Sequence, residues 1–260
     1  MRARDRLLGR EALERSPLRV LVLGDTHGDH SHLRFALGIC ATGGISTIVQ
    51  VGDNGYTWPG LGGLKHAIQL LEHAGVTMYW LEGNHDNYTE LIELGFWGAT
   101  TPQVYGSHNF VYLPRGCVFD LDGVRCGAFG GAVSVDKDYR ILVGRGWWPE
   151  EYISDEQVDA FTEQVSVLFT HDAPYRESGP LEDYLTAEWR MPVPYEVQSE
   201  QSRRRIARLM ANAKPRLLVH GHYHHLYGDM HRCGTKVIGL GHNGGRPEES
   251  YVIIDLDHYA

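Results

Sequence analysis

The chain has 260 residues, of which 42% are hydrophobic and 22% are charged, a composition typical of a globular protein. Its formal net charge of −9 argues against a general nucleic-acid binder that depends on a basic surface, so we expect no stable nucleic-acid partner. No segment approaches the ~20 apolar residues that a membrane helix needs, which argues against a membrane protein of that kind.

The start of the chain and its cysteines predict a cytoplasmic protein. Residues Met1 to Arg19 carry charges throughout and contain no apolar core of signal-peptide length. The four cysteines are scattered and form no CxxC pair, which favours reduced thiols over a disulfide. Because the chain has no Pro/Gly/Ser-rich linker and no internal repeat, we expect residues 1–260 to form a single domain. No feature specifies an oligomeric state.

Hydrophobic, β-branched runs alternate with helical segments along the first part of the chain. The runs at Arg19–Gly24, Thr47–Gly52 and Thr77–Gly83 predict strands. Between them, Ser31–Cys40 and Leu64–His73 predict helices. This alternation is typical of an α/β sheet.

The middle of the chain predicts consecutive strands, and the last two of them are joined by a hairpin turn at Asp122-Gly123. Helices and strands then follow up to the C-terminus, and Ser154 is a good N-cap for the first of these helices. A mixed sheet with helices outside fits this order. The predicted strands are Phe110–Leu113, Cys117–Leu121, Val124–Gly130, Ser166–Thr170, Arg216–His220, Lys236–Leu240 and Tyr251–Leu256, and the helices are Ser154–Gln164 and Ser199–Ala213.

The segment 173–200 departs from this order because it combines four prolines with several aromatic residues. A loop of this length in a compact domain is typically a lid or a substrate loop, and the alternative is a surface excursion folded over its own aromatic rings. Its Tyr175, Tyr184 and Trp189 offer a stacking surface for a nucleobase.

Five of the predicted strands are followed by side chains that can bind a metal ion. Ligands of open α/β sheets bind beyond the carboxyl ends of the strands, so these side chains should meet in one place. Residues two apart, such as Asp25 and His27, lie on one face of extended backbone and can share an ion. A single such residue would indicate a turn or a hydrogen-bonded core residue, whereas five blocks in succession predict a metal site. The candidate ligands are Asp25, His27, Asp53, Asn84, His171, His222 and His224.

These blocks resemble the signature of the calcineurin-like metallophosphoesterase superfamily: Asp25-Thr-His27, Gly52-Asp53, Gly83-Asn84-His85-Asp86, His171 and Gly221-His222-Tyr-His224. The resemblance implies an α/β fold, a four-layer α/β/β/α sandwich of two mixed β-sheets flanked by helices. It also implies two divalent metal ions that share Asp53. The first would be held by Asp25, His27, Asp53 and His224, and the second by Asp53, Asn84, His171 and His222. Nitrogen and oxygen ligands without thiolate favour Mn, with Fe or Zn as alternatives, over Ca.

The resemblance further implies the catalytic and substrate-binding residues. His85 is expected to face the substrate together with Asn84 and to protonate the leaving alkoxide as a general acid. Asp86 is expected to hold the His85 ring, and its alternative role is that of a helix N-cap or a turn residue. His242 also follows a predicted strand, and no role is assigned to it.

The segment Gly130–Lys137, together with Arg140 and Trp147-Trp148, is similar to bacterial and phage-type members of the superfamily. Lys137 and Arg140 are predicted to be either substrate contacts or solvated surface charges. The basic run Arg203-Arg204-Arg205 is interpreted as the solvated face of a helix. The substrate pocket is expected to be shaped by residues 173–200 and by Trp147-Trp148.

The sequence therefore predicts a dinuclear metal-dependent hydrolase of phosphate esters, in which a metal-bound hydroxide is the nucleophile. Asp53 is followed by Asn54-Gly55 instead of the Arg-Gly of the protein phosphatase branch, so the arginine that grips a dianionic phosphate is missing. This favours phosphodiesterase activity on small substrates such as 2′,3′-cyclic nucleotides. The alternatives are a broad phosphomonoesterase, a nuclease and a non-catalytic scaffold. A nuclease would be expected to have an additional basic region, and a scaffold would be expected to have lost ligands or His85.

Overall fold

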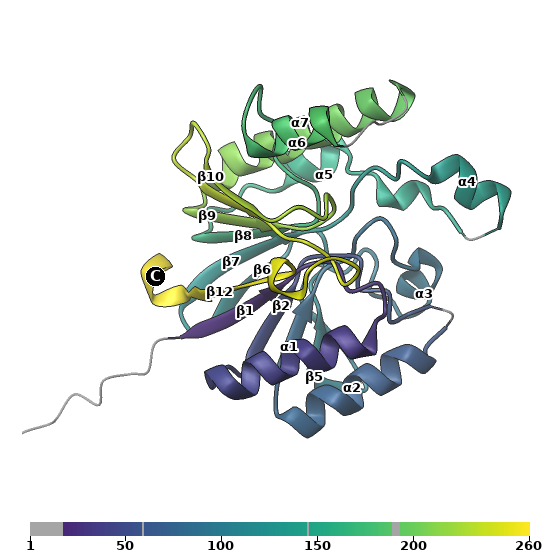
Figure 1. The fold of residues 1–260 in the computed structure, drawn as a ribbon, viewed down its shortest axis with the longest axis vertical. Helices are drawn as coiled ribbons and strands as arrows, with labels where there is room; N and C mark the ends of the chain where they lie inside the picture. The colour runs from purple at the N-terminus through teal and green to yellow at the C-terminus, as the bar shows by residue number, and fades with distance from the viewer. Residues whose placement is uncertain (1–17, 59, 145, 189–192) are drawn as a thin grey trace, which may run out of the picture.

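Two six-stranded mixed β-sheets lie face to face, and helices cover their outer faces (Figure 1). This computed structural model describes residues 18–58, 60–144, 146–188 and 193–260. The arrangement confirms the four-layer α/β/β/α sandwich predicted from the sequence.

The first sheet has the strand order β12-β1-β2-β3-β5-β4. Its four central strands are parallel, and β12 and β4 pair antiparallel with them at the two edges. The strands are β1 (Arg19–Leu23), β2 (Thr47–Gln50), β3 (Thr77–Trp80), β4 (Gln103–Tyr105), β5 (Ser107–Tyr112) and β12 (Tyr251–Asp255).

The second sheet repeats this plan in the order β10-β11-β9-β8-β7-β6, with four parallel strands between two antiparallel edges. In both sheets the parallel strands carry their following loops to the same edge, which places those loops together. The strands are β6 (Val118–Leu121), β7 (Val124–Phe129), β8 (Val167–Thr170), β9 (Leu217–His220), β10 (Tyr227–Met230) and β11 (Lys236–Gly239).

Helices α1 (His30–Gly43) and α2 (Gly62–Ala74) lie on the outer face of the first sheet, and α5 (Asp155–Ala160) and α7 (Val193–Ala213) cover the second (Figure 1). Helix α4 (Lys137–Leu142) projects to one side of the sandwich (Figure 1). The remaining short helices are α3 (Tyr88–Glu93) and α6 (Pro180–Ala187), and 3₁₀ turns span Pro149–Glu151, Pro247–Glu249 and Leu256–Tyr259.

Side chains along each strand point alternately to the two faces of the sheet, and this divides the hydrophobic core into layers. In β1, Leu21 and Leu23 pack toward α1 and α2, whereas Val20 and Val22 pack between the two sheets. Successive strand side chains point to opposite faces, so a strand buried on both sides has to be apolar throughout. At ~1.5–3 kcal/mol for each fully buried aliphatic side chain, this burial is the main force that holds the loops of the two sheets against each other.

The predicted strands are all present, and the Asp122-Gly123 hairpin turn is confirmed by the positive φ angles of both residues, 51° and 94°. Ser154 caps α5 as predicted, but this helix ends at Ala160 instead of Gln164. Helix α7 begins at Val193, six residues before the predicted start, because a sequence with Pro194 at its beginning suits the first turn of a helix. Edge strands β4 and β10 were not predicted, since they are short and half exposed.

None of the described helices is both long and apolar enough to cross a bilayer. The four cysteines all lie in the described part of the chain and are free thiols. Cys40, Cys117 and Cys126 are buried, and Cys233 is exposed. Burial raises the pKa of Cys117 to about 12, which keeps that thiol protonated.

Candidate metal centre

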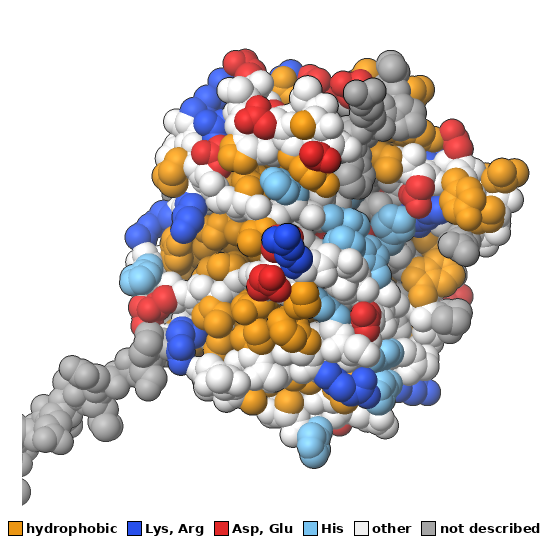
Figure 2. Space-filling view, in the orientation of Figure 1, with side chains coloured by type: hydrophobic (Ala, Val, Ile, Leu, Met, Phe, Trp, Pro, Cys, Tyr) orange, Lys and Arg blue, Asp and Glu red, His pale blue; other side chains and the backbone are white. Residues whose placement is uncertain are grey.

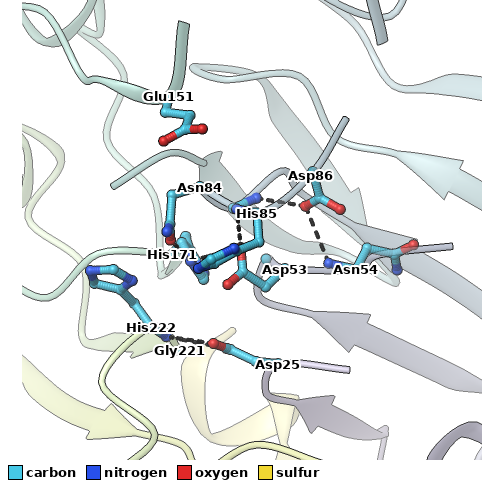
Figure 3. Close-up of polar contacts among 12 residues, drawn as sticks. Asp25, Asp53, Asn54, Asn84, His85, Asp86, Glu151, His171, Gly221 and His222 are labelled. Carbon is cyan, nitrogen blue, oxygen red and sulfur yellow. Dashed lines mark hydrogen bonds and ion pairs between the residues drawn. The ribbon is translucent and has the colours of Figure 1, made fainter. Parts of the chain in front are cut away.

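The carboxyl ends of five parallel strands meet at one edge of the sandwich and bring the predicted ligands together (Figure 3). Strands β1, β2 and β3 come from the first sheet, and β8 and β9 come from the second. Both sheets therefore contribute to one site. The side chains that follow these strands are Asp25 and His27, Asp53, Asn84 and His85, His171, and His222 and His224.

One group of ligand atoms is centred on Asp25, which is fully buried. The Nε2 atom of His224 lies 3.0 Å from Asp25 Oδ2, and the backbone amide of His222 donates to both carboxylate oxygens at 3.1 and 3.2 Å. One ligand atom each of Asp25, His27 and His224 lies within 4.8 Å of the others. Three ligands at this spacing fit a single divalent ion.

A second group is centred on Asp53 and shares a carboxylate with the first. Asp53 Oδ2 lies 3.4 Å from His27 Nε2, and Asp53 Oδ1 lies 3.3 Å from His171 Nε2. The Oδ1 atom of Asn84 lies 2.9 Å from the same His171 nitrogen. Ligand atoms of Asp25, Asp53 and His171 also lie within 4.8 Å of one another. Asp53 therefore presents one oxygen to each group, which is the geometry that a bridging ligand needs.

The backbone is strained where these ligands lie. Among the described residues other than glycine, six have a positive φ, and four of the six are predicted ligands: His27 (45°), Asp53 (53°), His222 (67°) and His224 (54°). A left-handed conformation of a residue with a Cβ costs on the order of 1–3 kcal/mol and persists where the surrounding structure imposes it. Such strain is typical of a binding site and has no role in packing.

Two glycines allow the carboxylates to approach the loops. A Cβ on Gly83 would lie 2.1 Å from Asp53 Oδ1, and a Cβ on Gly221 would lie 2.1 Å from Asp25 Oδ1. Any side chain at either position would displace a predicted ligand. The Gly-Asn and Gly-His pairs of the sequence are thus explained by this close approach.

The imidazole rings are oriented by their second nitrogens. His171 Nδ1 lies 2.8 Å from the carbonyl oxygen of Val51, and His27 Nδ1 lies 2.9 Å from Asn243 Oδ1. In both rings this leaves Nε2 facing the carboxylates. An outer hydrogen bond of this kind fixes which nitrogen is available to a metal ion. The residues present therefore fit a pair of divalent cations.

Protons balance the buried carboxylates in the metal-free site. Burial alone would lower the pKa of His171, but the charge of Asp53 and its contact with the ring raise it to about 10. For His27, the same contest between burial and Asp53 raises the pKa to about 9. Burial and the neighbouring His171 lower the pKa of His222 well below its ordinary value, so that ring is neutral. Without metal ions, the protonated His27 and His171 rings therefore supply the positive charge beside Asp53.

Metal uptake should therefore release protons. Near neutral pH, His27 and His171 are protonated in the metal-free protein, and each has to lose its proton before Nε2 can bind an ion. We expect Mn²⁺ binding at about pH 7.5 to release about two protons, and the apparent affinity to rise with pH until these groups have titrated. Calorimetric titration in buffers of different ionisation enthalpy measures this number. A value near zero would contradict the protonation assigned to the pair.

Asp86 is fully buried, but it does not contact the His85 ring in the way that we expected from the sequence. Its Oδ1 accepts a hydrogen bond from the amide of Gly55 at 2.8 Å, and its Oδ2 accepts from the amides of Gly83 at 2.8 Å and Asn54 at 3.2 Å. Two of these bonds hold the turn that follows β2, and the third holds the loop that follows β3. The expected role is corrected to the alternative one, that of a turn residue.

The carboxylate that faces the His85 ring belongs to Asp136, which sequence reasoning missed. His85 Nε2 lies 3.9 Å from Asp136 Oδ1, a buried oxygen for which the described residues supply no hydrogen-bond donor. The backbone amide of His85 donates to Asp53 Oδ1 at 2.8 Å, which ties its position to the metal ligands. Burial lowers the pKa of His85, and the charges of Asp53 and Asp136 oppose that effect. Asp136 is 51 residues away in sequence, so no local pattern connects the two.

A buried polar network orients Asn84 from behind. Its Nδ2 donates to Ser134 Oγ at 3.0 Å, and Ser134 Oγ donates to Glu151. Arg140 Nη1 donates to Ser134 Oγ at 2.8 Å and to the carbonyl oxygen of Asn84 at 3.1 Å, while Arg140 Nη2 pairs with Glu151 at 2.9 Å. The amide oxygen of Asn84 is thereby directed toward His171 (Figure 3).

This network rules out one of the two expectations for Arg140, whereas those for Lys137 stay predictions. Arg140 is 4% exposed, so it is not a solvated surface charge, and its guanidinium is occupied by Glu151, Ser134 and two carbonyl groups. Lys137 Nζ lies 3.7 Å from the centre of the Trp147 ring, a cation–π contact. Ser134 and Glu151 carried no sequence signal.

The segment 173–200 packs behind the metal ligands. Ala173 and Leu181 form a small hydrophobic cluster with Tyr223, between His222 and His224. Tyr175 lies 3.8 Å from the Arg204 guanidinium, and Tyr184 stacks on His225 with ring centres 4.2 Å apart. Both described rings thus contact residues outside the segment, Trp189 lies outside the described residues, and the role of the segment as a lid or substrate loop stays a prediction.

The basic run in α7 is only partly a solvated face. Arg203 is 5% exposed and pairs with Glu182, so the prediction for this residue was wrong. Arg205 is half-buried and pairs with Asp155 at 2.9 Å. Arg204 is exposed, as expected for a surface charge.

His242 lies beside the ligands of the first group. Its ring stacks on His224 with centres 4.0 Å apart and an interplanar angle of 10°, and its backbone forms a parallel bridge with Asp25. Figure 2 shows the histidines gathered in a hollow between the two halves of this face. His242 thus forms part of the wall of the site.

A cavity of about 720 Å³ opens beside the predicted ligands. Its lining combines catalytic candidates with side chains from the loop after β2 and from α4. Trp147 and Trp148 are not among the lining residues, although Trp148 contacts Trp58 in the wall with ring centres 5.8 Å apart. The lining residues are His27, Asp53, Gly55, Trp58, His85, Asp136, Tyr139, Arg140 and Gly144.

Comparisons with solved structures find the same overall fold. A protein of Thermus thermophilus has a similar crystal structure, with a TM-score of 0.61 and 15% sequence identity over 94% of this chain and 97% of that one. A dimetal phosphatase from Danio rerio superposes with a TM-score of 0.53 and 13% identity over 91% and 92% of the two chains. No curated protein sequence matches the chain.

The similarity to these structures concerns the fold, since the identities are low. The family assignment rests on the sequence itself, in which residues 18–226 match the model of the calcineurin-like phosphoesterases. This span runs from the start of β1 past His224 and includes every predicted ligand. The bacterial and phage-type subgroup stays a prediction. The chain belongs to the calcineurin-like phosphoesterase family.

Proposed function

We propose that the protein is a dinuclear metal-dependent phosphodiesterase that acts on small substrates, with 2′,3′-cyclic nucleotides as the substrate class. One observation carries this proposal: five carboxylate and imidazole side chains form two overlapping groups that could hold a metal ion, the Asn84 amide oxygen and the His222 ring lie against His171, and His85 lines the adjoining cavity. Such a set of strained, buried and charged groups serves binding and catalysis rather than packing.

The ligands divide between two ions as the family resemblance implies. Asp25, His27 and His224 would hold the first, Asn84, His171 and His222 the second, and Asp53 both. When bound, the two ions supply the positive charge that polarises the phosphate and lowers the pKa of water. The nitrogen and oxygen donor set favours Mn, with Fe or Zn as alternatives.

His85 is positioned to serve as the general acid. Its ring lines the cavity, its side chain is 39% exposed, and its amide is held by Asp53. A proton on Nε2 can be delivered to the leaving alkoxide, and Asp136 can stabilise the charged ring before transfer. Asn84, which precedes His85, would contact the substrate as the family resemblance implies.

The preference for a diester follows from the charges in the cavity. The lining contains Arg140, whose guanidinium is occupied by Glu151, Ser134 and two carbonyl groups. A monoester dianion would need an additional cationic group, whereas a diester carries one negative charge that the metal ions can balance. The poor alkoxide leaving group of a diester also requires an acid such as His85.

The test compares substrates after chelation and reconstitution with saturating Mn²⁺. We expect kcat/KM for bis-nitrophenyl phosphate and for 2′,3′-cyclic AMP to equal or exceed that for nitrophenyl phosphate. If the monoester is preferred about tenfold or more, the protein is a phosphomonoesterase and the diesterase proposal is wrong. If none of the three is hydrolysed, the catalytic proposal itself fails.

A further inference from the structure

The cavity beside the metal ligands extends well beyond the space that a phosphate group needs. Its volume of about 720 Å³ lies within the range of sites that enclose an organic ligand. Part of its lining consists of two aromatic side chains from different elements. Trp58 lies on the loop after β2, and Tyr139 lies on α4.

Trp58 is held in place although one part of it is open to solvent. Its Nε1 donates to the carbonyl oxygen of His85 at 3.2 Å, and its ring contacts Trp148 with centres 5.8 Å apart. Trp148 is itself fixed, because its Nε1 donates to Thr89 Oγ1 at 3.0 Å. The remaining 37% of Trp58 is exposed. A large ring fixed on two sides and open on a third is a preformed stacking surface.

Tyr139 is 55% exposed and belongs to a helix that is tied to the site. The next residue, Arg140, is buried and bonded to the carbonyl of Asn84, to Ser134 and to Glu151. These bonds fix α4 relative to the predicted ligands, although the helix projects from the body of the sandwich (Figure 1). Figure 2 shows hydrophobic side chains next to the histidine-lined hollow on that side of the molecule.

The charges of the lining indicate what kind of group fits there. The Arg140 guanidinium is occupied by Glu151 and Ser134, and Asp136 would repel a second anionic group. This part of the cavity therefore favours a flat, neutral group over a second phosphate or an acidic peptide. Within segment 173–200, the described Tyr175 lines a different cavity with Arg204 and His231.

We propose that Trp58 and Tyr139 form a subsite that binds a planar aromatic group of the substrate, such as a nucleobase, while its phosphate lies at the metal ligands. This inference rests on the proposed phosphoesterase function and names the part of the substrate that the enzyme recognises. Stacking on an aromatic side chain tolerates any base, so selectivity for aromatic over non-aromatic esters is expected rather than selectivity among bases.

The test compares two cyclic diesters, 2′,3′-cyclic AMP and glycerol 1,2-cyclic phosphate, of which the second carries no aromatic group. In the Mn-loaded protein, Trp58→Leu should raise the ratio of the KM for cyclic AMP to that for the glycerol ester about 5- to 150-fold. Trp58→Phe, which keeps a ring, should retain most of the discrimination, and Tyr139→Leu should lose part of it. Tyr175→Leu is the matched control and should leave the ratio unchanged. A uniform loss on both esters in Trp58→Leu would overturn the subsite.

A second measurement tests the aromatic subsite independently of whether the protein hydrolyses diesters. Calorimetry of the Mn-loaded protein compares the binding of adenosine 3′-monophosphate with that of glycerol 2-phosphate. Tighter binding of the nucleotide that is lost in Trp58→Leu supports the subsite even if the wild type hydrolyses no diester. Equal affinities of the wild-type protein for the two monoesters would overturn it, even if diesterase activity is found.

Discussion

An Asp53→Asn variant is expected to lose phosphoesterase activity to the detection limit while remaining folded. Asp53 is 1% exposed and presents one oxygen toward His27 and the other toward His171. The amide replacement keeps the shape of the side chain but removes the charge that both ions would share, so the affinity for both should fall. Loss of an outer hydrogen-bond partner of a ligand already costs about 10–100-fold in metal affinity or activity, and loss of the bridge should cost more.

The measurements are metal content after dialysis, activity with added Mn²⁺, and circular dichroism to establish folding. Asp172→Asn is the matched control, because Asp172 is equally buried and follows His171 but bonds to Ser202, Tyr223 and the Ala173 amide. This control should lose stability and keep both ions. Full activity in a folded Asp53→Asn protein would rule out the bridging role.

His85→Ala is expected to keep both metal ions and to lose about 10²–10⁴-fold in kcat on substrates with poor leaving groups. The loss should be much smaller for nitrophenyl esters, because nitrophenolate leaves without a proton. Measuring kcat for 2′,3′-cyclic AMP and for bis-nitrophenyl phosphate tests this dependence. An equal loss on both would mean that His85 binds the substrate and does not protonate it.

The roles of the two carboxylates near His85, Asp136 and Asp86, can be compared by substituting each with asparagine. Asp136 Oδ1 faces the ring at 3.9 Å, whereas both oxygens of Asp86 bind backbone amides. Asp136→Asn should therefore lower kcat more for 2′,3′-cyclic AMP than for bis-nitrophenyl phosphate, in the same direction as His85→Ala. Asp86→Asn should mainly lower the free energy of unfolding, because it weakens the turn after β2. The reverse pattern would restore the role that the sequence suggested for Asp86.

The sequence predicted the layers of the fold and the position of the ligands because both depend on local patterns. Hydrophobic runs such as Leu21–Leu23 define buried strands, and the residue after a parallel strand necessarily lies at the edge where ligands bind. The left-handed backbone at Asp53 and His222 was not predictable in this way, because it results from the turn that the whole site imposes.

What the sequence could not provide is the outer layer of the site. Ser134, Asp136 and Glu151 reach Asn84 and His85 only because the loop after β7 folds back over the end of β3. Polar residues in a loop give no periodic signal, and Arg140 looked like an exposed charge until its partner Glu151 was placed. The same is true of Trp58 and Tyr139, which line one cavity from segments about 80 residues apart.

The division of the predicted ligands between two sheets has a consequence for the protein during its synthesis. Asp25, His27, Asp53 and Asn84 belong to the first sheet, and His171, His222 and His224 belong to the second. A nascent chain that has emerged only as far as β5 carries one predicted imidazole ligand of the first ion and no predicted imidazole ligand of the second. If the predicted ligands hold the ions, such a chain could neither retain a pair of ions nor hydrolyse phosphate esters. The metal centre would thus form only after the two sheets have packed together, and a partly synthesised or misassembled chain would be inactive.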